Sequence, residues 1–204
     1  MAVITISRDL ASGGRKLGRM LARKLNYQYV DKSLFQKIAE DLKVSEKTLE
    51  SFENSREYRI SNIFSGLFSK SYIERIVGHD KSVVEEQGYQ NSLKNLIRDV
   101  AREDNVMIIG RAAYFFLKDW GNCYRFRLIA SMDWRKKYAV QEHAMSEAQA
   151  GKVLEKSDKN RLWFNRSICG ESFYDPFCFH LMLNMDYISF EKAAELILSV
   201  VNPD

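Results

Sequence analysis

Short apolar segments alternate with helical segments along the sequence. Five segments have the β-branched or continuously apolar composition of buried strands: residues 3–7, 27–30, 106–109, 124–130 and 180–184. Stretches between them carry apolar residues at helical spacing. Strands separated by helices pair in parallel, because each helix returns the chain to the same edge of the sheet. The sequence therefore predicts an α/β fold, a three-layer sandwich in which helices cover both faces of a five-stranded parallel sheet, with residues 27–30 at one edge.

The first predicted strand runs into a loop of small residues and then into a basic helix. A glycine-containing turn at a helix N-terminus directs backbone N–H groups and the helix dipole toward one point, which favours an anion such as phosphate. The loop does not match the phosphate-loop motif GxxxxGK[ST], because Gly14 stands at the lysine and Arg15 at the Ser/Thr. An ordinary turn between a strand and a helix therefore stays open as an alternative.

Arginine follows several of the predicted strands. In a parallel sheet covered on both faces, ligands bind beyond the carboxyl ends of the strands. Arg8, Arg111 and Arg135 lie in these positions, and the planar guanidinium group suits phosphate. Arg111 is the most informative, because a single glycine separates it from the apolar strand 106–109. The alternative is an arginine at a helix start that pairs with a nearby carboxylate.

A second charged segment, residues 156–161, has the sequence Lys-Ser-Asp-Lys-Asn-Arg. Its functional interpretation is a lid whose arginines close on transferring phosphates and stabilise their charge. Its alternative interpretation is a solvated helix face, which is the commoner fate of a run of charges. We expect Ser33 and Ser189 as N-caps of helices, and a polar helix that starts at Ser146.

Composition excludes several classes of function. Lys and Arg outnumber Asp and Glu by 31 to 27, which favours an anionic ligand but falls short of the basic stripe of a nucleic-acid binder. Three cysteines without CxxC spacing and three scattered histidines predict neither a disulfide framework nor a metal site, and they favour a reducing, cytoplasmic location. No uncharged apolar run approaches the ~18 residues of a membrane span. The aromatic-rich segments 64–72 and 173–179 are candidates for a surface shared between copies of the chain.

Taken in order, five segments resemble the cytidylate kinase-like proteins, a branch of the nucleoside-monophosphate kinases within the P-loop fold. These segments are Ile4–Arg8 with Ser12–Arg15, Tyr29–Asp31, Ile108–Ala112, Asp158–Arg161 and Leu183–Asp186. The resemblance covers nearly the whole chain. It implies one domain over residues 1–204, with residues 32–90 as an inserted monophosphate-binding lobe and about residues 145–175 as a lid.

The resemblance also implies three sets of site residues. The first loop would bind nucleotide phosphates through Arg8, Ala11, Ser12, Gly13, Gly14 and Arg15. The monophosphate would be bound by Asp31, Ser33, Lys37, Arg111, Asp158 and Arg161, with the arginines toward phosphate and Asp158 toward the sugar. The candidate catalytic cations are Arg111, Arg161, Arg135 and Lys16. Lys16, Arg8 or Arg15 is the candidate substitute for the lysine of the family's phosphate loop.

Departures from the family pattern leave two functions to weigh. Gly14 replaces the loop lysine, Arg15 replaces the magnesium-binding hydroxyl, Ala11 replaces a glycine, and Ile109 leaves no acidic residue at the end of the third strand. ATP is the expected phosphate donor, and Mg²⁺ is expected without an evident protein ligand. One hypothesis is a kinase that transfers the terminal phosphoryl group of ATP to a nucleoside monophosphate such as CMP or dCMP. The other is a catalytically weak nucleotide-binding or regulatory protein.

Overall fold

The computed structural model describes residues 2–34, 86–143 and 145–202. Its sheet has five parallel strands: β1 (Val3–Arg8), β2 (Gln28–Val30), β3 (Val106–Ile109), β4 (Cys123–Ile129) and β5 (Leu181–Asn184). They lie in the order β2-β3-β1-β4-β5. The predicted parallel sheet, with the second strand at an edge, is confirmed.

β1 is the central strand, because its apolar side chains can be buried on both faces. Val3, Ile4 and Ile6 are fully buried. Ile6 lies beside Ile109 of β3, and Ser7 lies beside Arg127 of β4. The carboxyl ends of β3, β1 and β4 therefore meet at one edge of the sheet, which brings together the loops that follow these strands.

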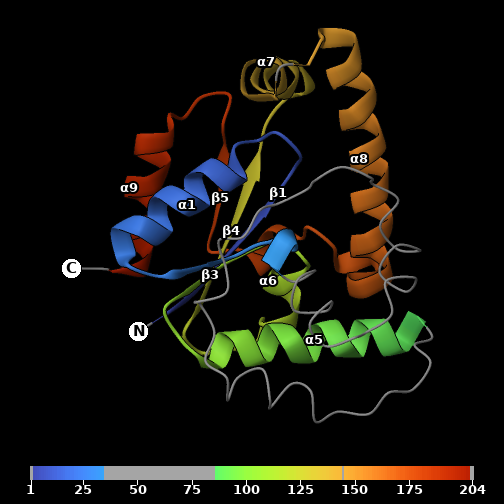
Figure 1. The fold of residues 1–204 in the computed structure, drawn as a ribbon. Coiled ribbons are helices and arrows are strands. Elements are labelled where there is room, and N and C mark those ends of the chain that lie inside the picture. The colour runs from blue at the N-terminus through green and yellow to red at the C-terminus, as the bar shows by residue number, and fades with distance from the viewer. Residues whose placement is uncertain (1, 35–85, 144, 203–204) are drawn as a thin grey trace.

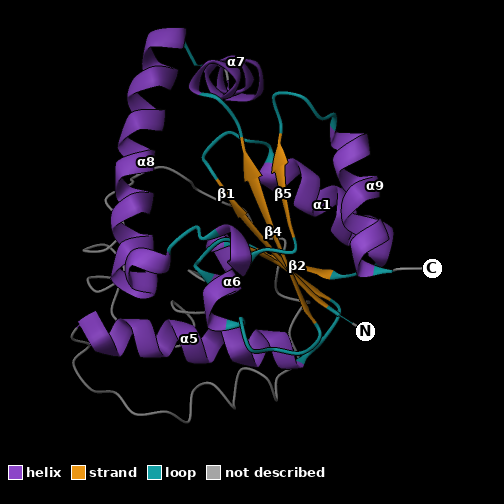
Figure 2. Cartoon of the chain, turned by 180° about the vertical axis from the view of Figure 1, so that it is seen from behind, coloured by secondary structure: helices purple, strands orange, loops and turns teal. Residues whose placement is uncertain are grey.

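Helices cover both faces of the sheet, as predicted. One face packs against α1 (Gly14–Leu25) and α9 (Phe190–Val201). The other packs against α5 (Glu86–Arg102), α6 (Ala113–Phe116) and the C-terminal part of α8 (Glu147–Cys169). α7 (Met132–His143) follows β4 and contacts α8 (Figures 1 and 2). Two short 3₁₀ helices, Gly170–Ser172 and Pro176–Cys178, precede β5.

Side-chain caps fix where several helices begin. The Ser146 hydroxyl accepts from the N–H of Gln149, whose side chain accepts from the N–H of Ser146, so α8 begins with a capping box. Ser189 caps α9 by accepting from the N–H of Lys192. The expectation that Ser33 is an N-cap is wrong: the helix starts at Lys32, and Asp31 Oδ1 accepts from the N–H of Ser33 at 3.0 Å. A carboxylate two residues earlier reaches this N–H, so Ser33 lies inside the first turn.

Several predictions lie partly or wholly outside the described residues. The inserted lobe at residues 32–90 is described only at its two ends, and Lys37 and the aromatic segment 64–72 are not described. The predicted lid at residues 145–175 corresponds to α8 and the segment after it, and its role stays a prediction. Phe177 in the second aromatic segment is 96% exposed, and a shared surface there stays a prediction. In the described part, no helix is both long and apolar enough to span a membrane.

Candidate functional site

The loop between β1 and α1 has a backbone that presents helix N–H groups. Ala11 (φ 59°) and Gly13 (φ 81°) are left-handed, and Gly13 is the N-cap of α1. A Cβ on Gly13 would lie 2.3 Å from the ring of Phe190, so the position requires glycine for space as well as for φ. The Ser12 hydroxyl donates to the Asp9 carbonyl at 3.0 Å. The first N–H groups of α1 have no partner within the helix, which suits an anion.

The Arg8 side chain crosses this loop in space left by two glycines. A Cβ on Gly14 would lie 2.8 Å from Arg8 Cγ, and a Cβ on Gly110 would lie 1.8 Å from an Arg8 guanidinium nitrogen. A lysine at position 14, as the family pattern has it, is therefore incompatible with Arg8 in this position. Within the described part of the chain, the Arg8 guanidinium makes no hydrogen bond or ion pair. Arg8 thus brings a positive charge to the loop that lacks its lysine.

Backbone conformation directs the next arginine. Gly110, Arg111 and Ala112 at the end of β3 all have positive φ, at 77°, 58° and 52°. A left-handed backbone at residues other than glycine costs about 1 kcal/mol or more each and is concentrated at binding sites. These three left-handed residues turn the chain sharply from β3 into α6, and Arg111 therefore lies at the carboxyl edge of the sheet.

Five basic side chains gather at this edge, and we call them the cationic cluster: Arg8, Arg15, Lys32, Arg111 and Arg161. Burial, followed by repulsion from neighbouring guanidinium groups, lowers the pKa of Arg8 to about 9 and that of Arg111 to about 10. Burial and the four arginines lower the pKa of Lys32 to about 8. Burial also lowers the pKa of Arg161. So much like charge in one place is unfavourable without an anion to balance it.

Hydrogen bonds hold the cluster in place. Arg161 of α8 donates from one guanidinium nitrogen to the Arg8 carbonyl at 3.1 Å and from Nε to Ser157 Oγ at 3.2 Å. Arg15 Nε lies 3.9 Å from Asp31 Oδ2, and Asp31 is buried. α8 is therefore joined directly to the first loop, while Asp31 joins α1 to the end of β2.

A buried hydroxyl also lies beside the cluster. Burial and the charge of Asp31 raise the pKa of Tyr29 to about 12. The Tyr29 hydroxyl is buried and has no hydrogen-bond partner in the described part of the chain. A polar group in this state is a candidate for contact with a ligand.

Two buried arginines outside the cluster pair with the carboxylates of Asp9 and Asp158. Arg127 donates to Asp9 at 2.9 Å, and its guanidinium lies 3.4 Å from the centre of the Tyr174 ring. Arg135 of α7 donates to both oxygens of Asp158 of α8, at 2.9 and 2.8 Å. This pairing with Asp158 raises the pKa of Arg135. Asp158 therefore joins α7 to α8 in this structure.

The structure brings together most of the residues that sequence analysis selected. The first loop, Arg8, Arg15, Asp31, Arg111 and Arg161 converge, and Ser33 contributes its backbone N–H to Asp31. Lys16 is an exception: its ammonium group lies 3.4 Å from Glu142 and 4.9 Å from the centre of the Phe190 ring, on the exposed side of α1. Arg135 is held by Asp158 outside the cluster.

Sequence analysis missed two basic residues, Lys32 and Arg127. Each had a signal in the sequence. Lys32 follows Asp31 directly after a strand, and Arg127 is a charged residue within a strand that is otherwise buried at its centre. A charge inside a buried strand requires a partner, which here is Asp9 of the first loop.

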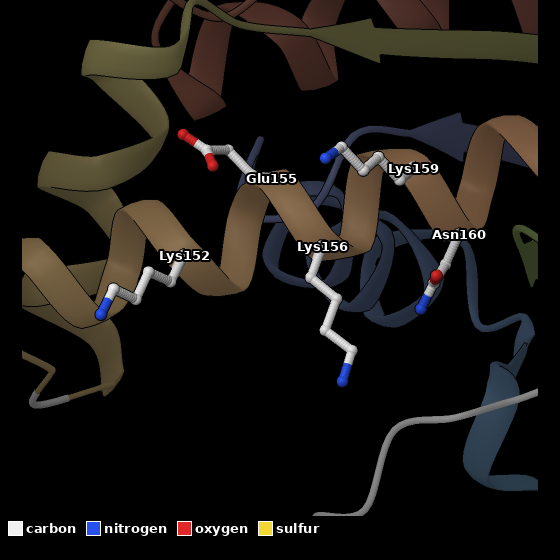
Figure 3. Close-up of a pocket in the computed structure, with 5 residues that line it drawn as sticks. All are labelled: Lys152, Glu155, Lys156, Lys159 and Asn160. Carbon is white, nitrogen blue, oxygen red and sulfur yellow. The ribbon is translucent and has the colours of Figure 1, made fainter.

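A shallow hollow of about 280 Å³ lies elsewhere, on α8 (Figure 3). It is lined by Lys152, Glu155, Lys156, Lys159 and Asn160. These side chains are mostly exposed and occupy the helix face opposite Arg161. Exposed lysines on an open surface stay hydrated, so this part of residues 156–161 is a solvated helix face, while Asp158 and Arg161 point inward. The cationic cluster, where like charges lie together and are partly buried, is the stronger candidate site.

Comparisons with known proteins identify the family. The profile of the cytidylate kinase-like family matches residues 3–187. The chain belongs to that family. A comparison with curated proteins gives no match.

Solved structures give the fold. An uncharacterized protein from Eubacterium ventriosum aligns with a TM-score of 0.70 at 19% identity, over 98% of this chain and 97% of that one. Shikimate kinase from Bacteroides thetaiotaomicron aligns at 0.54 and 16% identity, over 98% of both chains. A gluconokinase from Sinorhizobium meliloti aligns at 0.52 and 10% identity, over 98% and 91%. The fold of this family member is that of the P-loop kinases.

The described residues do not fit a Mg²⁺ ion held by the protein. P-loop enzymes hold this ion with a loop hydroxyl and an aspartate at a strand end, where this chain has Arg15 and Ile109. Asp9 and Asp158 are paired with arginines, and Asp31 faces Arg15 while capping a helix. No cluster of three metal-ligating side chains occurs among the described residues.

Proposed function

We propose that the protein transfers the terminal phosphoryl group of ATP to a nucleoside monophosphate of the CMP or dCMP class. The observation that carries the proposal is the cationic cluster, five basic side chains held at the carboxyl edge of the sheet where ligands bind in this class of fold. Membership of the cytidylate kinase-like family supports the choice of nucleotides. A cytoplasmic location, where ATP is available, goes with the proposal.

The cluster divides naturally into two parts. In this proposal, Arg8, Arg15 and the N–H groups at the start of α1 bind the phosphates of ATP. Arg111, Arg161 and Lys32 are placed on the side of β2, β3 and α8, where they would bind the monophosphate. Ser33, Lys37 and Asp158 stay proposed monophosphate-binding residues, with Asp158 held by Arg135 in this structure.

The chemistry requires positioning and charge stabilisation more than a protein acid or base. A phosphate oxygen of the monophosphate attacks the terminal phosphorus of ATP. The bond from that phosphorus to the bridging oxygen breaks, and its electron pair leaves with ADP. Negative charge on the transferring group is stabilised by guanidinium groups on both sides, and such donors are worth most in a dry site.

A second function has its own support. Gly14 and Arg15 replace the loop lysine and hydroxyl, and Lys16 points away from the cluster toward Glu142. A protein with this site could bind nucleotides tightly and turn them over slowly. We therefore also consider a catalytically weak nucleotide-binding or regulatory protein.

One pair of measurements separates the two functions. A coupled assay follows ADP formation from ATP with each common nucleoside monophosphate, with Mg²⁺ present and with excess EDTA. Thermal shift of the same mixtures reports binding. Turnover with CMP or dCMP above the ATP-only rate supports the kinase. Stabilisation by nucleotides without turnover supports the binding protein. The absence of both turnover and stabilisation contradicts both proposals.

A further inference from the structure

The charge around the cluster is strongly unbalanced. Seven basic side chains surround the site, namely the five of the cationic cluster together with Arg127 and Arg135. Among the described residues they face three carboxylates, those of Asp9, Asp31 and Asp158. The excess of basic over acidic groups is therefore four, all at one edge of the sheet.

The positions that would hold a divalent cation carry guanidinium groups instead. Arg15 stands at the loop position of the magnesium-binding hydroxyl. At the end of β3, Gly110 leaves space that the Arg8 guanidinium fills. Two independent features of the chain thus put protein charge where a P-loop enzyme places Mg²⁺ and lysine.

We propose that the site binds its nucleoside polyphosphate as the metal-free anion, with Arg8 and Arg15 in place of the divalent cation. This inference rests on the proposed function for the identity of the ligand. A metal-free triphosphate carries about four negative charges near neutral pH, since each inner phosphate carries one and the terminal group nearly two. Arg8 and Arg15 supply two positive charges on the ATP side of the cluster, the charge of one Mg²⁺, whereas a bound Mg²⁺ would cancel half of the ligand's charge and repel the arginines.

Calorimetric titration of the whole protein with ATP tests the inference directly. One titration contains EDTA, the other contains excess Mg²⁺, and the ionic strength is the same in both. We expect ATP to bind at least about tenfold more tightly with EDTA, because two of the four ligand charges are then available to the arginines.

Two variants assign the effect to the loop. Arg15→Ser restores a hydroxyl at the family's metal-binding position and removes one cation. We expect it to reduce the ratio between the two ATP affinities by about tenfold, mainly by weakening metal-free binding. Arg23→Ala removes an exposed cation from the last turn of the same helix and should leave the ratio as in the unaltered protein.

Equal or tighter ATP binding with Mg²⁺ overturns the inference, and so does a ratio that Arg15→Ser leaves unchanged. ADP formation with CMP, followed in the same two solutions, separates this outcome from failure of the proposed function. Preference for metal-free ATP without phosphoryl transfer supports the inference and contradicts the kinase. Phosphoryl transfer together with tighter binding of the magnesium complex supports the kinase and overturns the inference. The absence of saturable ATP binding overturns both.

Discussion

Replacing Arg8 by methionine should have opposite effects on folding and on nucleotide binding. Methionine keeps a long, unbranched side chain but removes the charge. In the ligand-free protein, the change removes the cost of burying a charge and relieves repulsion from Arg161, Arg15 and Arg111. We therefore expect the free energy of unfolding to rise. In the complex, the same change removes a charged donor from the phosphates, so we expect ATP to bind more weakly.

The two magnitudes follow from different features of Arg8. A fall of its pKa from 12.5 to about 9 corresponds to several kcal/mol at ~1.4 kcal/mol per tenfold change. Solvent reaches part of the side chain and screens the repulsion, so we expect a gain of about 1–2 kcal/mol in the free energy of unfolding. A hydrogen bond between charged groups is worth about 1.5–3 kcal/mol, which predicts a roughly 10- to 100-fold weaker ATP affinity.

Urea unfolding followed by circular dichroism measures the first effect, and calorimetric titration with ATP measures the second. Arg23→Met is the matched control, because Arg23 is an exposed arginine in the last turn of α1, and we expect it to change stability by no more than about 0.5 kcal/mol. A less stable Arg8→Met protein with unchanged ATP affinity would refute the reasoning. Arg8 would then support the loop and bind no ligand.

Three further changes test other parts of the site. CMP affinity should fall as pH rises above about 8, because Lys32 then loses its proton. Ligand-free stability should rise over the same range, since the unfolded chain keeps that proton longer. Titration calorimetry at several pH values checks this, and Lys32→Met should remove the pH dependence. Gly13→Val places a side chain against the Phe190 ring, so it should destabilise the protein by about 2–3 kcal/mol. It should also weaken ATP binding more than CMP binding. Equal losses of affinity for the two nucleotides would count against the assignment of the loop to ATP. Asp158→Asn should cost about 2 kcal/mol of unfolding free energy in urea melts, because Arg135 loses its carboxylate, and an unchanged midpoint would show that this pair contributes nothing.

The sequence was sufficient to predict the sheet, because the evidence for it is local. Continuous apolar runs such as residues 106–109 are typical of strands buried on both faces of a sheet, and helices between the strands favour parallel pairing. The strand-end rule then placed Arg8 and Arg111 at the same edge, which the register of β1 and β3 confirms.

The rest of the site depends on contacts between distant segments, which spacing along the chain does not encode. Lys16 was a reasonable substitute for the missing lysine, yet Glu142 and Phe190 hold it on the other side of α1. The relation of Arg8 to Gly14 and Gly110 is a steric fit between the end of β1, the start of α1 and the turn after β3. Ser33 was expected to cap its helix, but one carboxylate, Asp31, reaches the N–H first.

The affinity of the Arg111→Ala variant for CMP tests most directly whether the cationic cluster is the nucleotide site. Both proposed functions require this interaction, so the measurement does not depend on turnover. We expect the dissociation constant to rise about 30-fold or more relative to the unaltered protein, from loss of a charge-assisted contact of roughly 2 kcal/mol. Arg23→Ala should bind CMP as the unaltered protein does. Equal CMP affinities of Arg111→Ala and Arg23→Ala would contradict the account.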